Sequence, residues 1–141
     1  MTFLRAWAPV HDSIATVVGA ELFEYFYGSD WRAHEERDVR PACSDYLVWV
    51  AEIDGRVVGF TAVDTSSHEV EREIYMLAVD PEHQRRGVGL DLTDFAVEQI
   101  GKAGKKVAVL ETGGDPGHAA ARATYTKAGF TALPIERYKQ L

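Results

Sequence analysis

The chain has 141 residues, of which 46 % are hydrophobic, and a formal net charge of −7. That length suits one compact domain with a real core, and that composition excludes a disordered chain. The acidity argues against nucleic acid or an anionic membrane as the main partner, because both need a cationic face. Cys43 is the only cysteine, which excludes an intrachain disulfide and a thiolate zinc cluster.

The sequence also bears on location. No apolar run is long enough to cross a bilayer, so we expect no membrane partner. The N-terminus lacks the basic region and the clean apolar core of a signal peptide, since His11, Asp12 and Glu21 interrupt it. We therefore expect a cytoplasmic protein, and the absence of repeats and linkers predicts a single domain over residues 1–141.

The first third of the chain predicts a strand, a helix and a less regular segment. Residues 2–8 are interpreted as a short strand. Apolar residues at helical spacing over 14–28 predict a helix that ends at a glycine. Residues 29–45 are polar, and Pro41 is expected to break them into a short helix and a loop.

The middle of the chain predicts three strands that follow one another. Residues 46–64 hold two β-rich runs around Asp54-Gly55, which is the strongest short hairpin signal. A third strand is expected over about 72–80.

The last part of the chain alternates helices and strands. We expect a helix over 88–103, a buried strand over 106–112, a helix over 118–128 and a last strand or two within 130–141. Gly129 suits the end of the last helix. This order of elements predicts an α/β fold with a mixed sheet and helices on both faces.

Residues 84–90, Gln-Arg-Arg-Gly-Val-Gly-Leu, stand where a strand gives way to a helix. A helix N-terminus has unpaired N–H groups and a partial positive charge, which suit an anion. Gly87 and Gly89 let the backbone come close to such an anion, and Arg85 and Arg86 add charge. The third glycine of a dinucleotide fingerprint and the Lys-Ser/Thr of a P-loop are both missing. The segment predicts a pyrophosphate site or, alternatively, a tight turn with solvated arginines.

Two motifs resemble those of the GCN5-related N-acetyltransferases (GNAT). Their first signature is a Gln/Arg-x-x-Gly-x-Gly/Ala loop directly after a buried strand, and it stands here as residues 84–89. Their second signature is a helix that ends in Tyr-x-x-x-Gly-Phe, and it stands here as residues 125–130. The likeness covers most of residues 46–130. It implies a single GNAT-like domain with a mixed, mostly antiparallel central sheet of six to seven strands.

The resemblance implies acetyl-CoA as the acetyl donor. In such proteins, the strands equivalent to 72–80 and 106–112 splay apart, and the pantetheine arm lies between them like an added strand. Backbone groups of Leu77, Ala78 and Val79 would pair with the arm and face the thioester carbonyl. The loop that would hold the pyrophosphate consists of Gln84, Arg85, Arg86, Gly87, Val88, Gly89 and Leu90.

The second motif implies two further site residues. Many relatives carry Asn seven residues before the motif tyrosine, and this chain has His118 there. His118 is expected either to position the cofactor arm or only to cap the helix. Tyr125, one turn past Ala121, is the candidate acid that gives a proton to the leaving thiolate. The alternative is a core tyrosine that packs against Ala121 and Phe130.

Glu73 is the candidate general base, directly or through a water, and Glu71 is the reserve. In relatives of the histone-modifying branch, a catalytic glutamate occupies the corresponding place on this strand. Unless a bulge intervenes, strand alternation puts Glu73 on one face with Tyr75, Leu77 and Val79. Apolar neighbours would raise the pKa of its carboxyl, which suits a base. The alternative is an exposed strand-end glutamate paired with an arginine.

An acceptor site is expected in the N-terminal region. Glu21, Glu24 and Tyr25 share one face of the first long helix. With Trp31 and Trp49 they could form an acidic, aromatic-lined pocket for a cation, and the alternative is a solvated acidic stripe. No two histidines stand at a metal-ligand spacing, so no metal is expected.

These observations predict an acetyl-CoA-dependent N-acetyltransferase. The acceptor would be a small-molecule or peptide primary amine that attacks directly in a ternary complex. Cys43 has no evident base beside it, so a route through an acyl-cysteine is less attractive. The alternative function is a catalytically weak acyl-CoA-binding sensor or regulatory module. Relatives are often dimers, so a homodimer is compatible with the resemblance.

Overall fold

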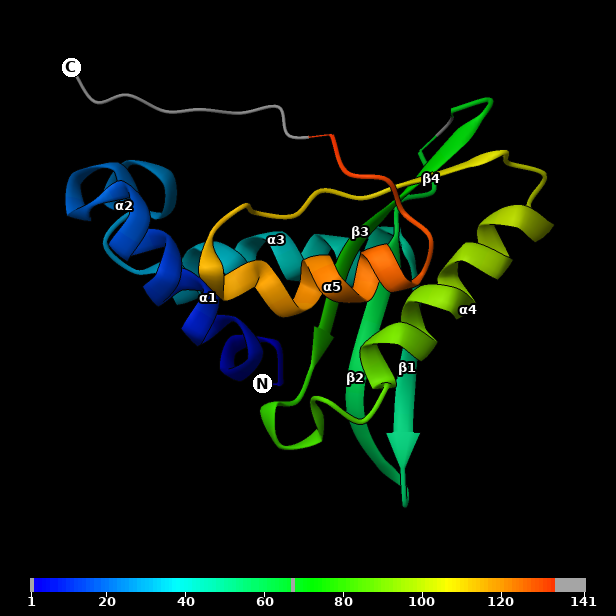
Figure 1. Ribbon diagram of the computed structural model, residues 1–141, viewed down its shortest axis with the longest axis horizontal. Helices are drawn as coiled ribbons and strands as arrows, with labels where there is room; N and C mark the ends of the chain where they lie inside the picture. Colours follow the sequence, from blue (N-terminus) through cyan, green and yellow to red (C-terminus); the bar gives the residue numbers. More distant parts are fainter. Residues whose placement is uncertain (1, 67, 134–141) are drawn as a thin grey trace.

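The computed structural model describes residues 2–66 and 68–133 (Figure 1). Its elements are α1 (Thr2–Val18), α2 (Ala20–Tyr27), α3 (Trp31–Asp45), β1 (Leu47–Ile53), β2 (Arg56–Val63), β3 (Glu71–Val79), η1 (Pro81–His83), α4 (Val88–Lys102), β4 (Val107–Val109), η2 (Pro116–His118) and α5 (Ala119–Lys127). Here η marks a single 3₁₀ turn. In the described part of the chain, no helix combines the length and the hydropathy needed to span a membrane.

The sheet has the strand order β1-β2-β3-β4 within the described residues. β1, β2 and β3 pair antiparallel, and β4 pairs with β3 in parallel. The mixed, mostly antiparallel sheet with helices is therefore confirmed. The number of strands is wrong, because four are present in the described residues where six to seven were predicted. Residues 2–8 contribute a helix instead, and most of 130–141 lies outside the described residues.

Residues 2–8 belong to α1, so the predicted first strand is wrong. Leu4, Trp7, His11 and Ile14 follow one another at intervals of three and four residues, which is the period of one helix face. This period emerges only when the run is followed well past residue 8. Leu4 and Trp7 pack against the core, which fixes the helix on the sheet.

The remaining N-terminal residues are more regular than predicted. Gly19, with φ of +87°, separates α1 from α2, so the single helix predicted over 14–28 is two helices. The side chain of Asp30 caps α3 by accepting the N–H groups of Arg32 and Ala33 at 3.1 and 3.4 Å. α3 then runs through Pro41 to Asp45, and the predicted break at the proline is wrong. Val39 and Ala42 are buried against the sheet, and this packing holds the helix across Pro41.

The predicted hairpin is confirmed between β1 and β2. Asp54 and Gly55 form its turn with φ of +52° and +74°. Two successive residues of positive φ match the right-handed twist of the two strands, which is why Asp-Gly is favoured there.

A bulge interrupts β3 and changes which side chains share a face. Ala62 pairs with Met76 and Val63 pairs with Ile74, so Tyr75 is the extra residue. Ile74 packs with the α4 side of the sheet, whereas Met76 packs with α1 and α3. This bulge is the exception that was allowed for, so Glu73, Tyr75, Leu77 and Val79 do not share one face. The bulge leaves Leu77 and Val79 on the α4 side and Tyr75 on the side of α3.

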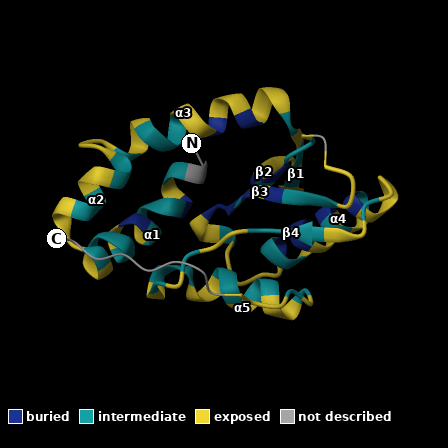
Figure 2. Cartoon of the chain, turned by 90° about the horizontal axis from the view of Figure 1, so that it is seen from above, coloured by how far each residue is buried: buried dark blue, intermediate teal, exposed yellow. Residues whose placement is uncertain are grey.

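The core lies in two layers, one on each face of the sheet. On one face, α1 and α3 cover Ala62, Met76 and Ala78. On the other face, buried side chains of α4 contact the strands. Figure 2 shows α3 on one side of the strands and α4 and α5 on the other, with buried residues between the layers. Helices on both faces were predicted, and this is confirmed.

Candidate active site

The candidate site is the gap that opens where β3 and β4 part. The two strands pair at only three positions, from Glu71 opposite Val107 to Glu73 opposite Val109. β3 continues for six more residues, but β4 ends. A cleft of about 880 Å³ fills the opening, and we call it the cleft below. Its walls come from α1 and α3, from β3, from the loop into α4, from residues 110–112, and from η2 and α5.

The free edge of β3 presents backbone groups to the cleft. The amide of Asp80 donates to the carbonyl of Val58 on β2 at 2.7 Å. The carbonyl of Met76 accepts the hydroxyl of Thr61, also on β2, at 3.0 Å. Because backbone direction alternates along a strand, Ala78 also points to β2. Leu77 and Val79 then point to the cleft. Of the three residues expected to pair with a cofactor arm, these two have their backbone groups on the open edge.

The loop between β3 and α4 forms one end of the cleft. Gln84 Nε2 donates to the carbonyl of Val79 at 3.1 Å, which ties the loop to the strand. Gly87, with φ of +83°, is the N-cap of α4 and offers no side-chain acceptor. The N–H groups of the first turn of α4 therefore have no side-chain cap, and a helix N-terminus of this kind suits an anion.

The predicted anion-binding residues do not all reach the cleft. Those that line it are Gln84, Arg85, Gly87, Gly89 and Leu90. The side chain of Arg86 is exposed outside that lining. Val88 is 8 % exposed and packs in the core, so only its backbone could face a ligand. Arg85 has φ of +64°, a left-handed conformation that turns the loop toward the helix.

Two carboxylates meet at the parting point of the strands. Burial raises the pKa of Glu73 above its ordinary value, and the charges of Glu111, Asp64 and Glu71 raise it further. Glu73 and Glu111 both line the cleft. Sequence reasoning missed Glu111. The available signal was its place at the end of the predicted strand 106–112, beside the strand that carries Glu73.

Tyr125 lines the cleft from α5, together with Ala121 one turn earlier. Burial raises the pKa of its phenol, so the hydroxyl stays protonated at neutral pH. Its ring meets Phe130 edge-on, with centroids 6.2 Å apart. Packing against Phe130 and exposure to the cleft are therefore compatible in one side chain.

His118 also lines the cleft, at the start of α5. It occupies the N-cap position but makes no side-chain cap, so the interpretation of His118 as a helix cap is wrong. Its Nδ1 lies 2.5 Å from Oδ1 of Asp115 instead.

The predicted acceptor residues do not gather at the cleft. Glu21, Glu24 and Tyr25 are exposed on α2, and Tyr25 is 82 % exposed. None of them lines the cleft, and neither does Trp31. Trp31 stacks on His11 with centroids 4.1 Å apart.

The N-terminal helices bring other groups to the cleft. His11 is only 4 % exposed; its Nδ1 lies 2.9 Å from the carbonyl of Trp7, and its Nε2 lies 3.0 Å from Glu35 Oε1. His11, Glu35 and Asp38 line the cleft. Sequence reasoning missed these residues because they come from two different helices, α1 and α3, that only the fold brings together. Within the described residues, no three His, Cys, Asp or Glu side chains gather as a metal site.

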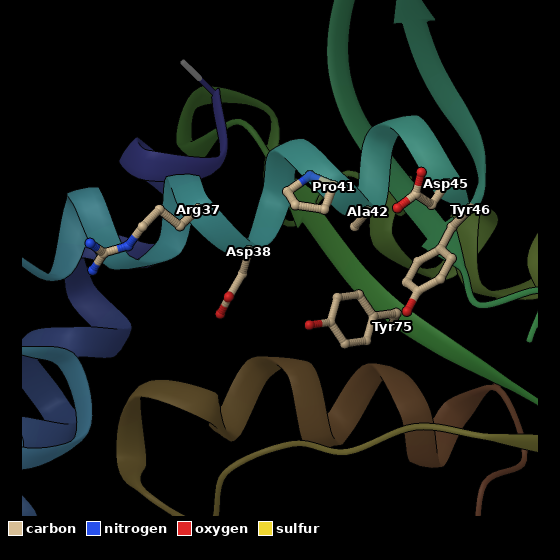
Figure 3. A pocket seen from close by; sticks show the side chains of 7 residues that line it. All are labelled: Arg37, Asp38, Pro41, Ala42, Asp45, Tyr46 and Tyr75. Atoms are coloured by element: carbon tan, nitrogen blue, oxygen red, sulfur yellow. The ribbon is translucent and has the colours of Figure 1, made fainter.

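A smaller hollow of about 150 Å³ adjoins the cleft between α3 and β3 (Figure 3). The two share Asp38 and Tyr75. The hydroxyl of Tyr75 points toward Asp38 in Figure 3. Burial raises the pKa of Tyr75, and the charges of Asp38 and Glu73 add to the effect. The end of the cleft near α3 and β3 is thus acidic, whereas Arg85 lies at the α4 end.

The chain is similar to known proteins in sequence and in fold. Residues 44–132 match the model of the acetyltransferase (GNAT) domain. The chain is 35 % identical over 144 residues to a mycothiol acetyltransferase of Amycolatopsis mediterranei, a match that covers 91 % of this chain and 46 % of that protein. The chain spans no more than about half the length of the mycothiol acetyltransferases that it matches.

Two solved structures share the fold. One is the PaiA N-acetyltransferase of Thermoplasma acidophilum in complex with coenzyme A, with a TM-score of 0.65, 19 % identity, and coverage of 95 % of this chain and 84 % of that one. The other is a GNAT acetyltransferase of Elizabethkingia anophelis with acetyl-CoA bound, with a TM-score of 0.62, 18 % identity, and coverage of 70 % and 63 %. The matched domain covers well over half of the chain, which therefore belongs to the GNAT acetyltransferase family.

Proposed function

We propose that this chain is an acetyl-CoA-dependent N-acetyltransferase that acetylates a primary amine in a ternary complex. The observation that carries the proposal is the gap between β3 and β4, which joins an uncapped helix N-terminus to a group of ionisable side chains. The relatives support it, since the Thermoplasma structure holds coenzyme A and the Elizabethkingia structure holds acetyl-CoA.

The cofactor would lie along the free edge of β3. Its diphosphate would accept N–H groups from the first turn of α4, with Arg85 adding positive charge. Its pantetheine amides would pair with the backbone of Leu77 and Val79. This placement directs the thioester toward the parting point of the strands, where Glu73 and Tyr125 line the cleft.

The reaction needs proton transfers at two atoms. A lysine-like ammonium titrates near ~10.4, so the acceptor must lose a proton before it attacks. Glu73 is the base for that step, because a raised pKa makes its carboxylate a better proton acceptor. The amine nitrogen then bonds to the thioester carbon, and the C–S bond breaks with its electron pair on sulfur. Tyr125 gives its hydroxyl proton to that sulfur.

The acidic groups favour an acceptor that arrives as a cation. Glu35, Asp38, Glu73 and Glu111 line the cleft. A primary ammonium would enter this region with favourable electrostatics, whereas an anionic acceptor would be repelled.

Calorimetry and thiol release test the proposal together. Acetyl-CoA is titrated into the protein, and free thiol is then followed with spermidine, glucosamine, lysine and a peptide with an N-terminal alanine. We expect binding, and thiol release with at least one amine. No heat of binding at millimolar acetyl-CoA would refute the proposal. Binding without release by any amine would favour the acyl-CoA-binding module instead.

Neighbouring arginines provide a matched pair of variants for the diphosphate site. Arg85→Ala is expected to raise the Kd for CoA about ten-fold, which corresponds to the loss of one charged hydrogen bond. Arg86→Ala, whose side chain lies outside the lining, should leave the Kd within about two-fold of the wild type. Equal effects of the two variants would contradict the proposed position of the diphosphate.

A further inference from the structure

The turn before α5 is built around a carboxylate–imidazole pair that the steps above do not use. His118 Nδ1 lies 2.5 Å from Asp115 Oδ1, and the side chain of Asp115 is only 7 % exposed. The amide of Gly117 donates to Asp115 Oδ2 at 3.1 Å. The same amide lies 2.8 Å from the hydroxyl oxygen of Ser13 on α1, 104 residues away in the chain. The pair is therefore held from two elements.

The surrounding loop packs closely on this pair. Arg122 Nη1 donates to the carbonyls of Gly113 and Asp115, both at 2.7 Å. A Cβ on Gly113 would collide with the Asp115 carboxylate and with the imidazole of His118. A Cβ on Gly117 would lie 2.6 Å from the Cβ of Ser13. Glycine at both positions lets the loop close tightly on the two side chains.

The contact fixes the tautomer of His118. Burial acts to raise the pKa of Asp115, but hydrogen bonds from His118 and Ser13 outweigh it, so the pKa lies below its ordinary value. An ionised carboxylate accepts only, so Nδ1 must carry the hydrogen. In the neutral ring, Nε2 is then unprotonated. Among the described residues, the hydrogen bond of the His118 ring is made by Nδ1, and His118 lines the cleft, which leaves Nε2 available to a ligand.

The proposed reaction needs a second proton acceptor. An ammonium nitrogen carries three protons and the amide product carries one, so two protons leave the nitrogen. Glu73 takes the first proton before attack. After attack, the nitrogen is again positively charged and must lose another. The sulfur receives one proton, and one is released to solvent.

We propose that Asp115 and His118 form the second proton acceptor of this acetyl transfer, with His118 Nε2 taking the proton that leaves the nitrogen after attack. The inference rests on the proposed function. Asp115 is a positioning residue that holds the ring and stabilises the imidazolium. The imidazolium then gives its proton to water, which reaches it because the side chain is 21 % exposed. The proton that Glu73 took from the ammonium passes to the Tyr125 phenolate, which restores both side chains to their starting states.

Charges around the pair favour this role. The titratable or charged groups that line the cleft are Glu35, Asp38, Glu73, Glu111, Arg85, Lys127, His11, Tyr27, Tyr75 and Tyr125, and Asp115 and Arg122 adjoin His118. The Arg122 guanidinium is turned to two backbone carbonyls. The five carboxylates outnumber the three cationic side chains, those of Arg85, Arg122 and Lys127, so the charges around the ring favour a positive group there.

The test compares the wild type with His118→Asn and Asp115→Asn. The readouts are the Kd for CoA by calorimetry, thermal unfolding, and the pH dependence of kcat with the amine of the panel above that releases thiol fastest. We expect His118→Asn to leave the Kd within about two-fold. It should lower kcat at least about ten-fold and change the acid limb of the profile. Asp115→Asn should lower kcat less than His118→Asn does, and the acid limb of its kcat–pH profile should also shift.

A second measurement does not depend on turnover. Nitrogen-15 NMR of labelled histidines, assigned with His118→Asn, should show the Nδ1–H tautomer of His118 in the wild type. Asp115→Asn should convert part of it to the Nε2–H tautomer, because an amide can donate to Nδ1. An Nε2–H tautomer in the wild type would overturn the inference.

The outcomes separate the two proposals. Wild-type protein that neither binds CoA nor releases thiol sinks the proposed function and this inference with it. If the wild type is active and His118→Asn has the same kcat and pH profile, the inference is refuted but the proposed function stands. The same holds if His118→Asn weakens CoA binding and leaves kcat intact, since His118 would then be only a cofactor contact. If His118→Asn unfolds, Asp115→Asn and the NMR measurement decide.

Discussion

The contact between β2 and α4 at Gly59 gives the sharpest prediction for a single methyl group. A Cβ built on Gly59 would lie 3.0 Å from the carbonyl oxygen of Ala78 and 3.1 Å from Cδ1 of Leu92. Leu92 can change rotamer, but the Ala78 oxygen belongs to the backbone of β3. Gly59→Ala therefore pushes the strand and the first turns of α4 apart.

The magnitude follows from this overlap. Adding a methyl group to a packed core costs about 1–3 kcal/mol. At about 4 °C per kcal/mol for a chain of this size, Tm should fall by ~4–12 °C. The Kd for CoA should also rise, because Val88 in the first turn of α4 lies 3.5 Å from the same Cβ and that turn would carry the diphosphate.

Gly101→Ala, in α4, is the matched control. Nothing lies within 4 Å of its Cβ position, and its backbone is helical. Alanine is the better helix former by roughly 0.5–1 kcal/mol, so Tm should rise slightly and the Kd for CoA should not change. Calorimetry of unfolding and of CoA binding checks both variants. If Gly59→Ala matched the wild type in Tm and Kd, the inferred closeness of sheet and helix would be refuted.

Three further predictions concern the titratable groups. Tyr125→Phe should lower kcat at least about ten-fold with the Kd for CoA unchanged, and unaltered thiol release would remove Tyr125 from its role. Glu111→Gln removes a charge that raises the pKa of Glu73, so the ascending limb of the kcat–pH profile should move to lower pH; a limb that stays in place would argue against Glu73 as the base. A hydrogen bond from the amide of Glu82 and the positive charges nearby outweigh burial and hold the pKa of Asp80 below its ordinary value. Asp80 therefore stabilises the fold fully above a pH of about 3.9, and this stabilisation is lost as the pH falls through the folded pKa. Asp80→Asn should therefore flatten the pH dependence of the urea midpoint in acid, and a midpoint profile that matches the wild type would contradict this.

Several features could be predicted from the sequence because they are local. The Asp54-Gly55 turn needs two residues of positive φ in succession, and few dipeptides allow that. The strand-to-helix junction at residues 84–90 could be recognised in the sequence because the start of a helix requires particular residues within one turn. Tyr125 and Phe130 meet because the end of α5 brings together two residues that are only five positions apart. In each case, the physical cause lies within a short stretch of chain.

The helices before residue 46 depended on tertiary structure. A run such as 2–8 fits a strand or a helix, and burial on the sheet decides for the helix. Packing also carries α3 across Pro41, which local propensity alone opposes. The bulge at Tyr75 is similar, since it arises from the pairing of β3 with β2 and its side chains then change faces.

The sequence by itself determined the family, the position of the glycine-containing junction at residues 84–90 and the tyrosine of the second motif. Only the tertiary structure placed Glu111 beside Glu73, brought Ser13 to the Asp115–His118 pair, and put Glu35 rather than Glu21 at the cleft. Those contacts join residues that are tens of positions apart in the chain. No local spacing encodes them, because they depend on how the strands part and how helices from distant segments pack around the opening.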